Sequence, residues 1–99
     1  MVRINWTFQA KKDLNAIAEY ISKDSKRYAK LQVIRLKNRT RILKIQIRTG
    51  KIVPEINQEN IRELIEGNYR IIYKIVENNQ IDILTIHHSA RDLKRRKIK

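Results

Sequence analysis

The sequence contains no cysteine, which excludes a disulfide framework and a thiolate metal site. Its two histidines, His87 and His88, are adjacent. Neighbouring side chains on a strand point to opposite faces, so this pair is a poor chelate. We therefore expect neither a metal nor another cofactor.

Long apolar runs are also missing. No run approaches the roughly 18 residues that a membrane span requires, and the N-terminus lacks the apolar core of a signal peptide. We therefore expect a cytoplasmic protein with no membrane partner. The 99 residues are enough for one core, so we expect a single domain, residues 1–99.

Acidic residues are scarce. Ten Asp and Glu stand against 23 Lys and Arg, which gives a formal net charge of +13 at pH 7. This imbalance favours a polyanionic partner, either nucleic acid or an acidic protein, although a basic surface can also serve solubility alone. The mostly positive tail, residues 91–99, is either solvated or an arm that contacts phosphates.

Glycine and proline are rare, so the few turn signals stand out. Three runs rich in Ile, Leu, Val and Tyr, Ile61–Ile65, Tyr69–Val76 and Ile81–His88, are separated by the pairs Gly67-Asn68 and Asn78-Asn79. Gly and Asn tolerate the positive φ angles of two-residue hairpin turns. The pattern predicts an antiparallel three-stranded meander.

A tight turn at Asn78-Asn79 pairs Arg70 with His87 across the ladder. It also sorts the two strands into two faces. We expect the mostly apolar face to meet the rest of the protein: Tyr69, Ile71, Tyr73, Ile75, Asp82, Leu84, Ile86 and His88. We expect the other face to be open and to carry the function: Arg70, Ile72, Lys74, Val76, Ile81, Ile83, Thr85 and His87.

The N-terminal half predicts a strand followed by two helices. Val2–Trp6 alternates like a strand, and Thr7 can cap a helix that ends near Lys23–Ser25. A longer helix is expected from about Lys26 to Arg48. Lys51–Asn60, which contains the single proline, reads as a loop.

The second predicted helix carries two apolar stripes in a segment without acidic residues. One stripe is Leu31, Ile34, Ile42 and Ile45, and the other is Val33, Leu36, Leu43 and Ile47. A helix packed on a sheet needs only one stripe. Either this helix is sandwiched between its partner helix and the sheet, or one stripe, flanked by basic residues, docks another protein.

Arg70, His87 or His88, and Arg91 are the residues with most chemical potential. A histidine can move a proton near neutral pH, and an arginine can stabilise charge on phosphate oxygens. Together they suit cleavage of RNA by its own 2′-hydroxyl, without a metal. The alternatives are a structural histidine and an Arg70 that pairs with an acidic residue of a partner.

Several motifs resemble the RelE/ParE family of toxins from type II toxin–antitoxin systems. The matching segments are Val53-Pro54-Glu55, Ile61-Arg62-Glu63-Leu64, Gly67-Asn68-Tyr69-Arg70-Ile71-Ile72-Tyr73, Ile83-Leu84 and His88-Ser89-Ala90-Arg91-Asp92-Leu93. The first predicted helix fits more loosely, through Ala10, Asp13-Leu14, Ile17 and Tyr20-Ile21. The likeness spans nearly the whole chain.

The resemblance implies an α+β fold of order β-α-α-β-β-β, a helical hairpin packed on a small antiparallel sheet, in agreement with the elements above. It implies a toxin silenced by a small acidic antitoxin in a hetero-oligomer. The predicted catalytic or effector residues, His87 from the hairpin register and the others in the matching segments, are Arg70, Tyr73, His87, His88, Arg91, Arg62 and Glu55. The implied antitoxin-binding residues are Val33, Leu36, Leu43, Ile47, Arg41 and Lys44.

The family divides into ParE-like inhibitors of DNA gyrase and RelE-like enzymes that cut mRNA on the ribosome. Glu63 and Glu66 stand where RelE-like enzymes tend to have lysine, and no tyrosine follows Arg91. The leading hypothesis is therefore a ParE-like gyrase inhibitor. A RelE-like endoribonuclease and a non-toxic basic binding module are the alternatives, so enzyme activity stays open. Hairpin register points to His87, whereas the family motif points to His88.

Overall fold

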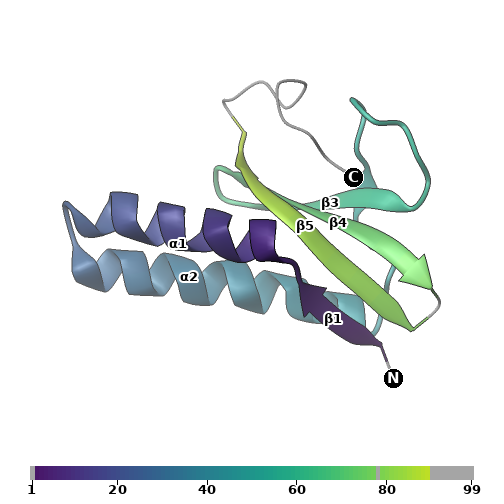
Figure 1. Cartoon of the computed structure of the whole chain (residues 1–99), viewed down its shortest axis with the longest axis horizontal. Coiled ribbons are helices and arrows are strands. Elements are labelled where there is room, and N and C mark those ends of the chain that lie inside the picture. Colours follow the sequence, from purple (N-terminus) through teal and green to yellow (C-terminus); the bar gives the residue numbers. More distant parts are fainter. Residues whose placement is uncertain (1, 78, 90–99) are drawn as a thin grey trace.

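The computed structural model describes residues 2–77 and 79–89, which form two helices against one sheet. The elements, in chain order, are β1 (Arg3–Trp6), α1 (Phe8–Ser22), α2 (Lys26–Arg39), a 3₁₀ helix η1 (Thr40–Lys44), β2 (Lys51–Ile52), β3 (Ile61–Glu66), β4 (Tyr69–Glu77) and β5 (Gln80–His88). The antiparallel α1–α2 hairpin extends beyond the sheet, as Figure 1 shows.

The sheet is mixed, with strand order β1-β5-β4-β3-β2. Strands β2 to β5 are antiparallel neighbours, whereas β1 runs parallel to β5, with Ile4 opposite Ile81. The predicted α+β fold with a helical hairpin on a sheet is confirmed. Two details differ from the prediction: the sheet was expected to be antiparallel, whereas β1 is parallel to β5, and Lys51–Ile52, expected in a loop, pairs with β3.

Both helices begin at side-chain caps. The Thr7 hydroxyl accepts a hydrogen bond from the backbone N–H of Ala10 at 3.2 Å, and the Ser25 hydroxyl accepts one from Tyr28 at 3.0 Å. Each cap supplies an acceptor to an N–H group that has no partner within its helix. The predicted cap at Thr7 is confirmed, and α1 ends one residue before the predicted Lys23–Ser25 boundary.

The second helix is shorter than predicted. It ends at Arg39 rather than Arg48, because the chain tightens into the 3₁₀ helix η1 from Thr40 onward. The Thr40 hydroxyl donates to the carbonyl of Lys37 at 2.7 Å, a local bond that competes with continued α-helix. This change of helical pitch was not visible in the spacing of apolar residues, which continues past it.

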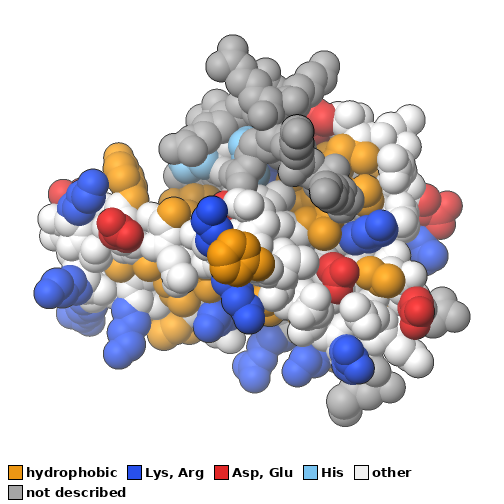
Figure 2. Space-filling model, viewed as in Figure 1, with side chains coloured by type: hydrophobic (Ala, Val, Ile, Leu, Met, Phe, Trp, Pro, Cys, Tyr) orange, Lys and Arg blue, Asp and Glu red, His pale blue; other side chains and the backbone are white. Residues whose placement is uncertain are grey.

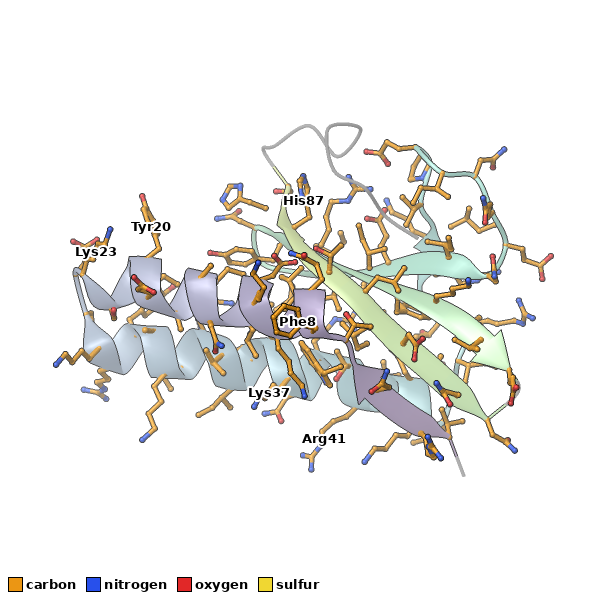
Figure 3. The ribbon with its side chains drawn as sticks, viewed as in Figure 1. Phe8, Tyr20, Lys23, Lys37, Arg41 and His87 are labelled. Atoms are coloured by element: carbon orange, nitrogen blue, oxygen red, sulfur yellow. The ribbon has the colours of Figure 1, made fainter. Side chains whose placement is uncertain are left out.

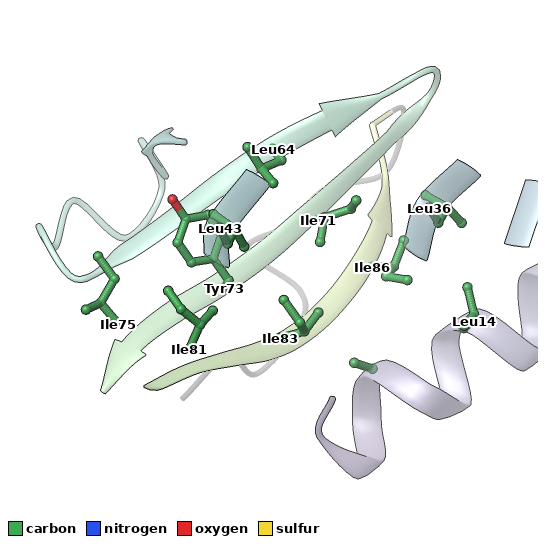
Figure 4. Close-up of a cluster of buried hydrophobic side chains, with 11 residues drawn as sticks. Leu14, Leu36, Leu43, Leu64, Ile71, Tyr73, Ile75, Ile81, Ile83 and Ile86 are labelled. Atoms are coloured by element: carbon green, nitrogen blue, oxygen red, sulfur yellow. The ribbon is translucent and has the colours of Figure 1, made fainter. Parts of the chain in front are cut away.

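The main core lies between the hairpin and the sheet. Figure 4 shows it around Leu36 and Leu43, which are both 0% exposed. Val33 and Ile47 pack against the same cluster. This stripe therefore faces inward, and the prediction that it forms a docking surface is wrong. Three residues of the other stripe are exposed, Leu31 by 39%, Ile34 by 46% and Ile45 by 81%, whereas its fourth residue, Ile42, packs against the core.

The β4–β5 hairpin contains two register shifts that compensate each other. From Tyr69 to Ile72, the part of β4 furthest from the turn, the predicted pairing holds, with Arg70 opposite His87. Leu84 is then an extra residue on β5, so Tyr73 pairs with Ile83, and Val76 is an extra residue on β4. A bulge reverses which face the following side chains occupy. Ile81 and Ile83 therefore enter the main core, contrary to the prediction that they lie on the open face.

The second face of the sheet is covered, contrary to prediction. A smaller apolar cluster forms there from Val53, Ile61 and Ile72, with Ile56 and Leu84 packed against it. The segment between β2 and β3 therefore lies over this face. Three residues predicted to be exposed there, Ile72, Thr85 and His87, are buried.

Candidate functional site

Arg70 is held by two carboxylates of the same chain. Its Nη1 and Nη2 donate to the carboxylate of Glu55 at 2.8 and 2.9 Å, and its Nε donates to Glu63 at 2.5 Å. Only 12% of the Arg70 side chain is exposed, against 26% for Glu55 and 3% for Glu63. Glu55 lies in the segment after β2, so the ion pairs fasten this segment to β3 and β4.

The two carboxylates also set the electrostatics of this cluster. The hydrogen bond with Glu55 is the largest cause of a raised Arg70 pKa; burial acts in the opposite direction and Glu63 adds to the rise. Lys51 contributes a second cation, its Nζ 4.0 Å from Glu63. Arg70 is therefore a permanent cation whose charge is already matched by neighbouring carboxylates.

The two histidines occupy different environments. His87 lies opposite Arg70 and is 1% exposed. His88 lies opposite Tyr69, with the ring centroids 5.4 Å apart and the ring planes at 87°. The predicted pairing of Arg70 with His87 is confirmed. An effector role for either histidine stays a prediction.

Tyr73 and Arg62 are not gathered around Arg70. Arg62 on β3 lies opposite Tyr73 on β4 in the strand register. Tyr73 is 0% exposed and belongs to the core between the helices and the sheet. The Tyr73 hydroxyl donates to the carbonyl of Ile47 at 2.9 Å and accepts from the N–H of Gly50 at 3.0 Å. Arg62 donates to the carbonyls of Glu59 and Gly50. These contacts fix the chain around β2, and burial raises the pKa of Tyr73.

Of the predicted effector residues, the structure therefore brings together Glu55, Arg70 and His87. Arg91 lies outside the described residues. Carboxylate oxygens already accept hydrogen bonds from Nε, Nη1 and Nη2 of Arg70, so a phosphate that approached Arg70 would compete with Glu55 and Glu63 for its charge. Among residues 2–77 and 79–89, no group of His, Cys, Asp and Glu side chains could hold a metal ion. The cluster, as arranged, is suited to positioning the segment after β2.

Cations without a carboxylate partner lie elsewhere, along α2 and η1. Figure 2 shows a row of Lys and Arg side chains along this side of the molecule. The exposed residues Lys30, Lys37, Arg41 and Lys44 form none of the ion pairs found in the described part of the chain. The exposed Leu31 and Ile34 also lie on α2, and the exposed Ile45 follows directly after η1. This surface, which we name the α2 face, is both basic and apolar.

Sequence reasoning gave no role to Asp13. Its carboxylate accepts hydrogen bonds from the Thr85 hydroxyl and from the N–H of Ile86 at 3.1 Å. Thr7, at the start of α1, donates to the carbonyls of Ile83 and Leu84. α1 thus supplies partners to β5 at its bulge, beyond the end of β1. The one signal in the sequence was an acidic residue directly after Lys11-Lys12, off the apolar stripe.

Comparisons with known proteins agree on the type of fold. Residues 4–93 match the family described as ParE toxin of type II toxin–antitoxin system, parDE. Among solved structures, a chromosomal ParDE system from P. aeruginosa superposes with a TM-score of 0.73 at 23% identity, covering 89% of this chain and 96% of that one. A comparison with curated sequences gives no match.

A second similar structure comes from the RelBE2 toxin–antitoxin complex of Mycobacterium tuberculosis. Its TM-score is 0.55 at 21% identity, and the match covers 88% of this chain and 96% of that one. At these identities the two superpositions establish the fold alone. In the described residues, no helix has the length and apolar character needed to cross a membrane.

Proposed function

Because this chain belongs to the ParE toxin family of type II toxin–antitoxin systems, we propose that it arrests growth by inhibiting DNA gyrase and that a cognate antitoxin silences it. Gyrase is a cytoplasmic enzyme, so the proposal places the toxin in the cytoplasm. The supporting comparisons are the family match over residues 4–93 and the similar ParDE structure.

One structural observation supports gyrase over mRNA as the target. Cleavage of RNA through its 2′-hydroxyl needs a cation that can face the charge developing on phosphate. Arg70, the best candidate, already binds Glu55 and Glu63 and is mostly buried. A toxin that acts by binding a protein needs no such free cation.

A supercoiling assay tests the proposal. Purified gyrase, relaxed plasmid and ATP are incubated with increasing toxin, and we expect supercoiling to fall. The same toxin preparation is added to translating ribosomes, and the mRNA is mapped for cuts. Undiminished supercoiling together with clear ribosome-dependent cleavage would reverse the assignment.

The RelE-like endoribonuclease remains a second candidate, because the register places His87 opposite Arg70 and His88, the histidine of the family motif, opposite the neighbouring Tyr69. It predicts that Arg70→Ala and His88→Ala each lower ribosome-dependent cleavage by about tenfold or more, through loss of charge stabilisation or proton transfer. Arg48→Ala, which removes a surface ion pair with Glu59, is the control. Folded Arg70 and His88 variants with full cleavage would eliminate this candidate.

The antitoxin partner is also part of the proposal. The similar ParDE structure is that of a toxin–antitoxin system. For this chain we expect an acidic amphipathic segment of the antitoxin on the α2 face, its apolar side chains against Leu31 and Ile34 and its carboxylates near Lys37 and Arg41. This surface replaces the buried stripe that the sequence suggested.

A pair of variants tests this docking surface. Ile34 and Val76 are exposed to similar degrees, 46% and 43%, but Val76 lies on β4. Ile34→Asp should weaken antitoxin binding by about tenfold or more, because it places a carboxylate within the apolar contact. Val76→Asp should leave affinity unchanged. Equal affinities in calorimetric titration would move the antitoxin to another surface.

A further inference from the structure

Phe8 is an aromatic side chain that neither the core nor the α2 face explains. It is the first residue of α1 and is 78% exposed, more than the exposed tyrosines Tyr20 and Tyr28. Exposing a phenylalanine forgoes the stabilisation that burial of its ring would give. An exposed ring of this kind is available to a ligand.

Basic side chains lie on the same side of the molecule as the Phe8 ring. Lys12, one helical turn further along α1, holds its Nζ 5.7 Å from the centroid of the Phe8 ring. Figure 3 shows Phe8 at the start of α1, which runs beside α2, with Lys37 and then Arg41 further down in the same view. All three cations are exposed, and none forms an ion pair within residues 2–77 and 79–89. We name Phe8, Lys12, Lys37 and Arg41 the Phe8 patch.

Acidic groups do not neutralise the patch. Asp13 follows Lys12 in the sequence, but its carboxylate is directed to β5, where it accepts hydrogen bonds from the Thr85 hydroxyl and the Ile86 N–H. No acidic residue occurs on α2 or η1. The patch therefore combines one accessible π-face with several uncompensated positive charges.

This combination fits one class of ligand. Proteins bind single-stranded nucleic acid by stacking unpaired bases on aromatic rings while Lys and Arg contact the phosphates. An acidic amphipathic peptide would instead need a run of apolar side chains to pack against, and that run lies at Leu31 and Ile34, outside the patch. A base in a duplex is already stacked and cannot use the ring.

We propose that the Phe8 patch binds single-stranded nucleic acid, with a base stacked on Phe8 and the adjoining phosphates on Lys12, Lys37 and Arg41. This is a binding activity beyond gyrase inhibition and does not depend on it. The patch should bind without sequence preference, because an aromatic ring stacks on every base and the cations of the patch contact only the phosphate backbone.

Fluorescence anisotropy with the purified full-length chain tests the stacking contact. The probes are labelled DNA and RNA single strands of about 12 nucleotides and a DNA duplex of the same length. Phe8→Ala should weaken single-strand binding by about tenfold. Tyr20→Ala is the matched control, because Tyr20 is 72% exposed on the same helix but lies near its far end. It should bind like the parent chain.

Salt dependence tests the phosphate contacts. Lys37→Gln and Arg41→Gln should each lower the slope of log K against log salt by about 0.7 for a single strand. Lys23→Gln, at the tip of the hairpin, should change the slope much less.

The proposal fails if Phe8→Ala and Tyr20→Ala bind single strands equally, or if Phe8→Ala weakens duplex binding by the same factor. It also fails if Phe8→Ala reduces binding only of an acidic peptide, poly-glutamate being the probe. Tighter binding of RNA than of DNA, or the reverse, with the Phe8 effect retained, supports the site and identifies the kind of strand.

Discussion

At the residue scale, the largest difference between the predicted and the observed environment is that of Arg70. Its place in the motif Tyr-Arg-Ile-Ile-Tyr suggested an exposed effector, but all three of its nitrogens donate to the carboxylates of Glu55 and Glu63. A buried charge that loses its partner is costly, whereas a surface pair contributes little. Arg70 therefore acts first on the stability of the fold.

This contrast gives a stability prediction for two glutamates. Glu63→Gln should lower the free energy of unfolding by about 2–4 kcal/mol, because Glu63 is 3% exposed and its carboxylate faces Arg70. Glu59→Gln removes an exposed pair with Arg48 and should cost about 1 kcal/mol or less. Urea denaturation followed by Trp6 fluorescence measures both. Similar losses for the two variants would contradict a buried ion cluster.

Tyr73 gives a prediction in pH. Its pKa is higher in the folded chain than in the unfolded one, where it is about 10. The unfolded state therefore loses the phenol proton first, and stability should fall as pH rises above about 10. Tyr73→Phe should reduce this fall, while costing about 1–3 kcal/mol at neutral pH through the unpaired Gly50 N–H and Ile47 carbonyl.

The control for Tyr73 is Tyr20→Phe, which changes an exposed phenol. It should leave both the neutral stability and its dependence on alkaline pH as in the parent chain. Chemical denaturation at pH values from 7 to about 11 provides the measurement. An alkaline loss of stability that persists unchanged in Tyr73→Phe would assign it to another group.

At the scale of elements, the sequence predicted each helix start and the three long strands. These follow from local chemistry: the Thr7 cap, the turn residues and the alternation of apolar side chains. The end of α2 and the bulge at Leu84 were missed. The bulge depends on tertiary partners, since α1 bonds the bulged backbone through Thr7 and Asp13. The end of α2 coincides with the bond from the Thr40 hydroxyl to the Lys37 carbonyl, which the spacing of apolar residues does not reveal.

The candidate site was predicted less well for the same reason. Hairpin arithmetic correctly placed Arg70 opposite His87. It could not show that Val53 and Ile56 fold back over this face, because the irregular segment between β2 and β3 has no periodicity to interpret. The two stripes of the second helix were recognised, but spacing alone does not tell which stripe meets the sheet.

The two stripes predict opposite mutational behaviour. Leu36→Ala should destabilise the chain by about 2–5 kcal/mol, because it opens a cavity at a residue that is 0% exposed. Ile34→Ala, on the exposed stripe, should cost about 0.5 kcal/mol or less. Thermal and urea unfolding compare the two. Equal costs would mean that the helix is rotated relative to this structure.

At the scale of the whole molecule, the net charge should set how fast the toxin associates with its antitoxin. With a formal net charge of +13, the toxin should attract an acidic antitoxin over distances longer than contact. We expect the association rate constant to fall by about tenfold or more as salt rises from low concentration to about 0.5 M. The dissociation rate should change much less. Stopped-flow mixing measures both, and association rates independent of salt would exclude electrostatic steering.

The strand order has a consequence for how the protein is made. β5 lies between β1 and β4, so the first strand finds its neighbour only when the last described strand is in place. Contacts between distant parts of a chain form late. A ribosome that is still translating the C-terminal third therefore carries an incomplete sheet. The complete sheet, and with it the folded toxin, can therefore form in the cell only after the polypeptide has been synthesised past His88.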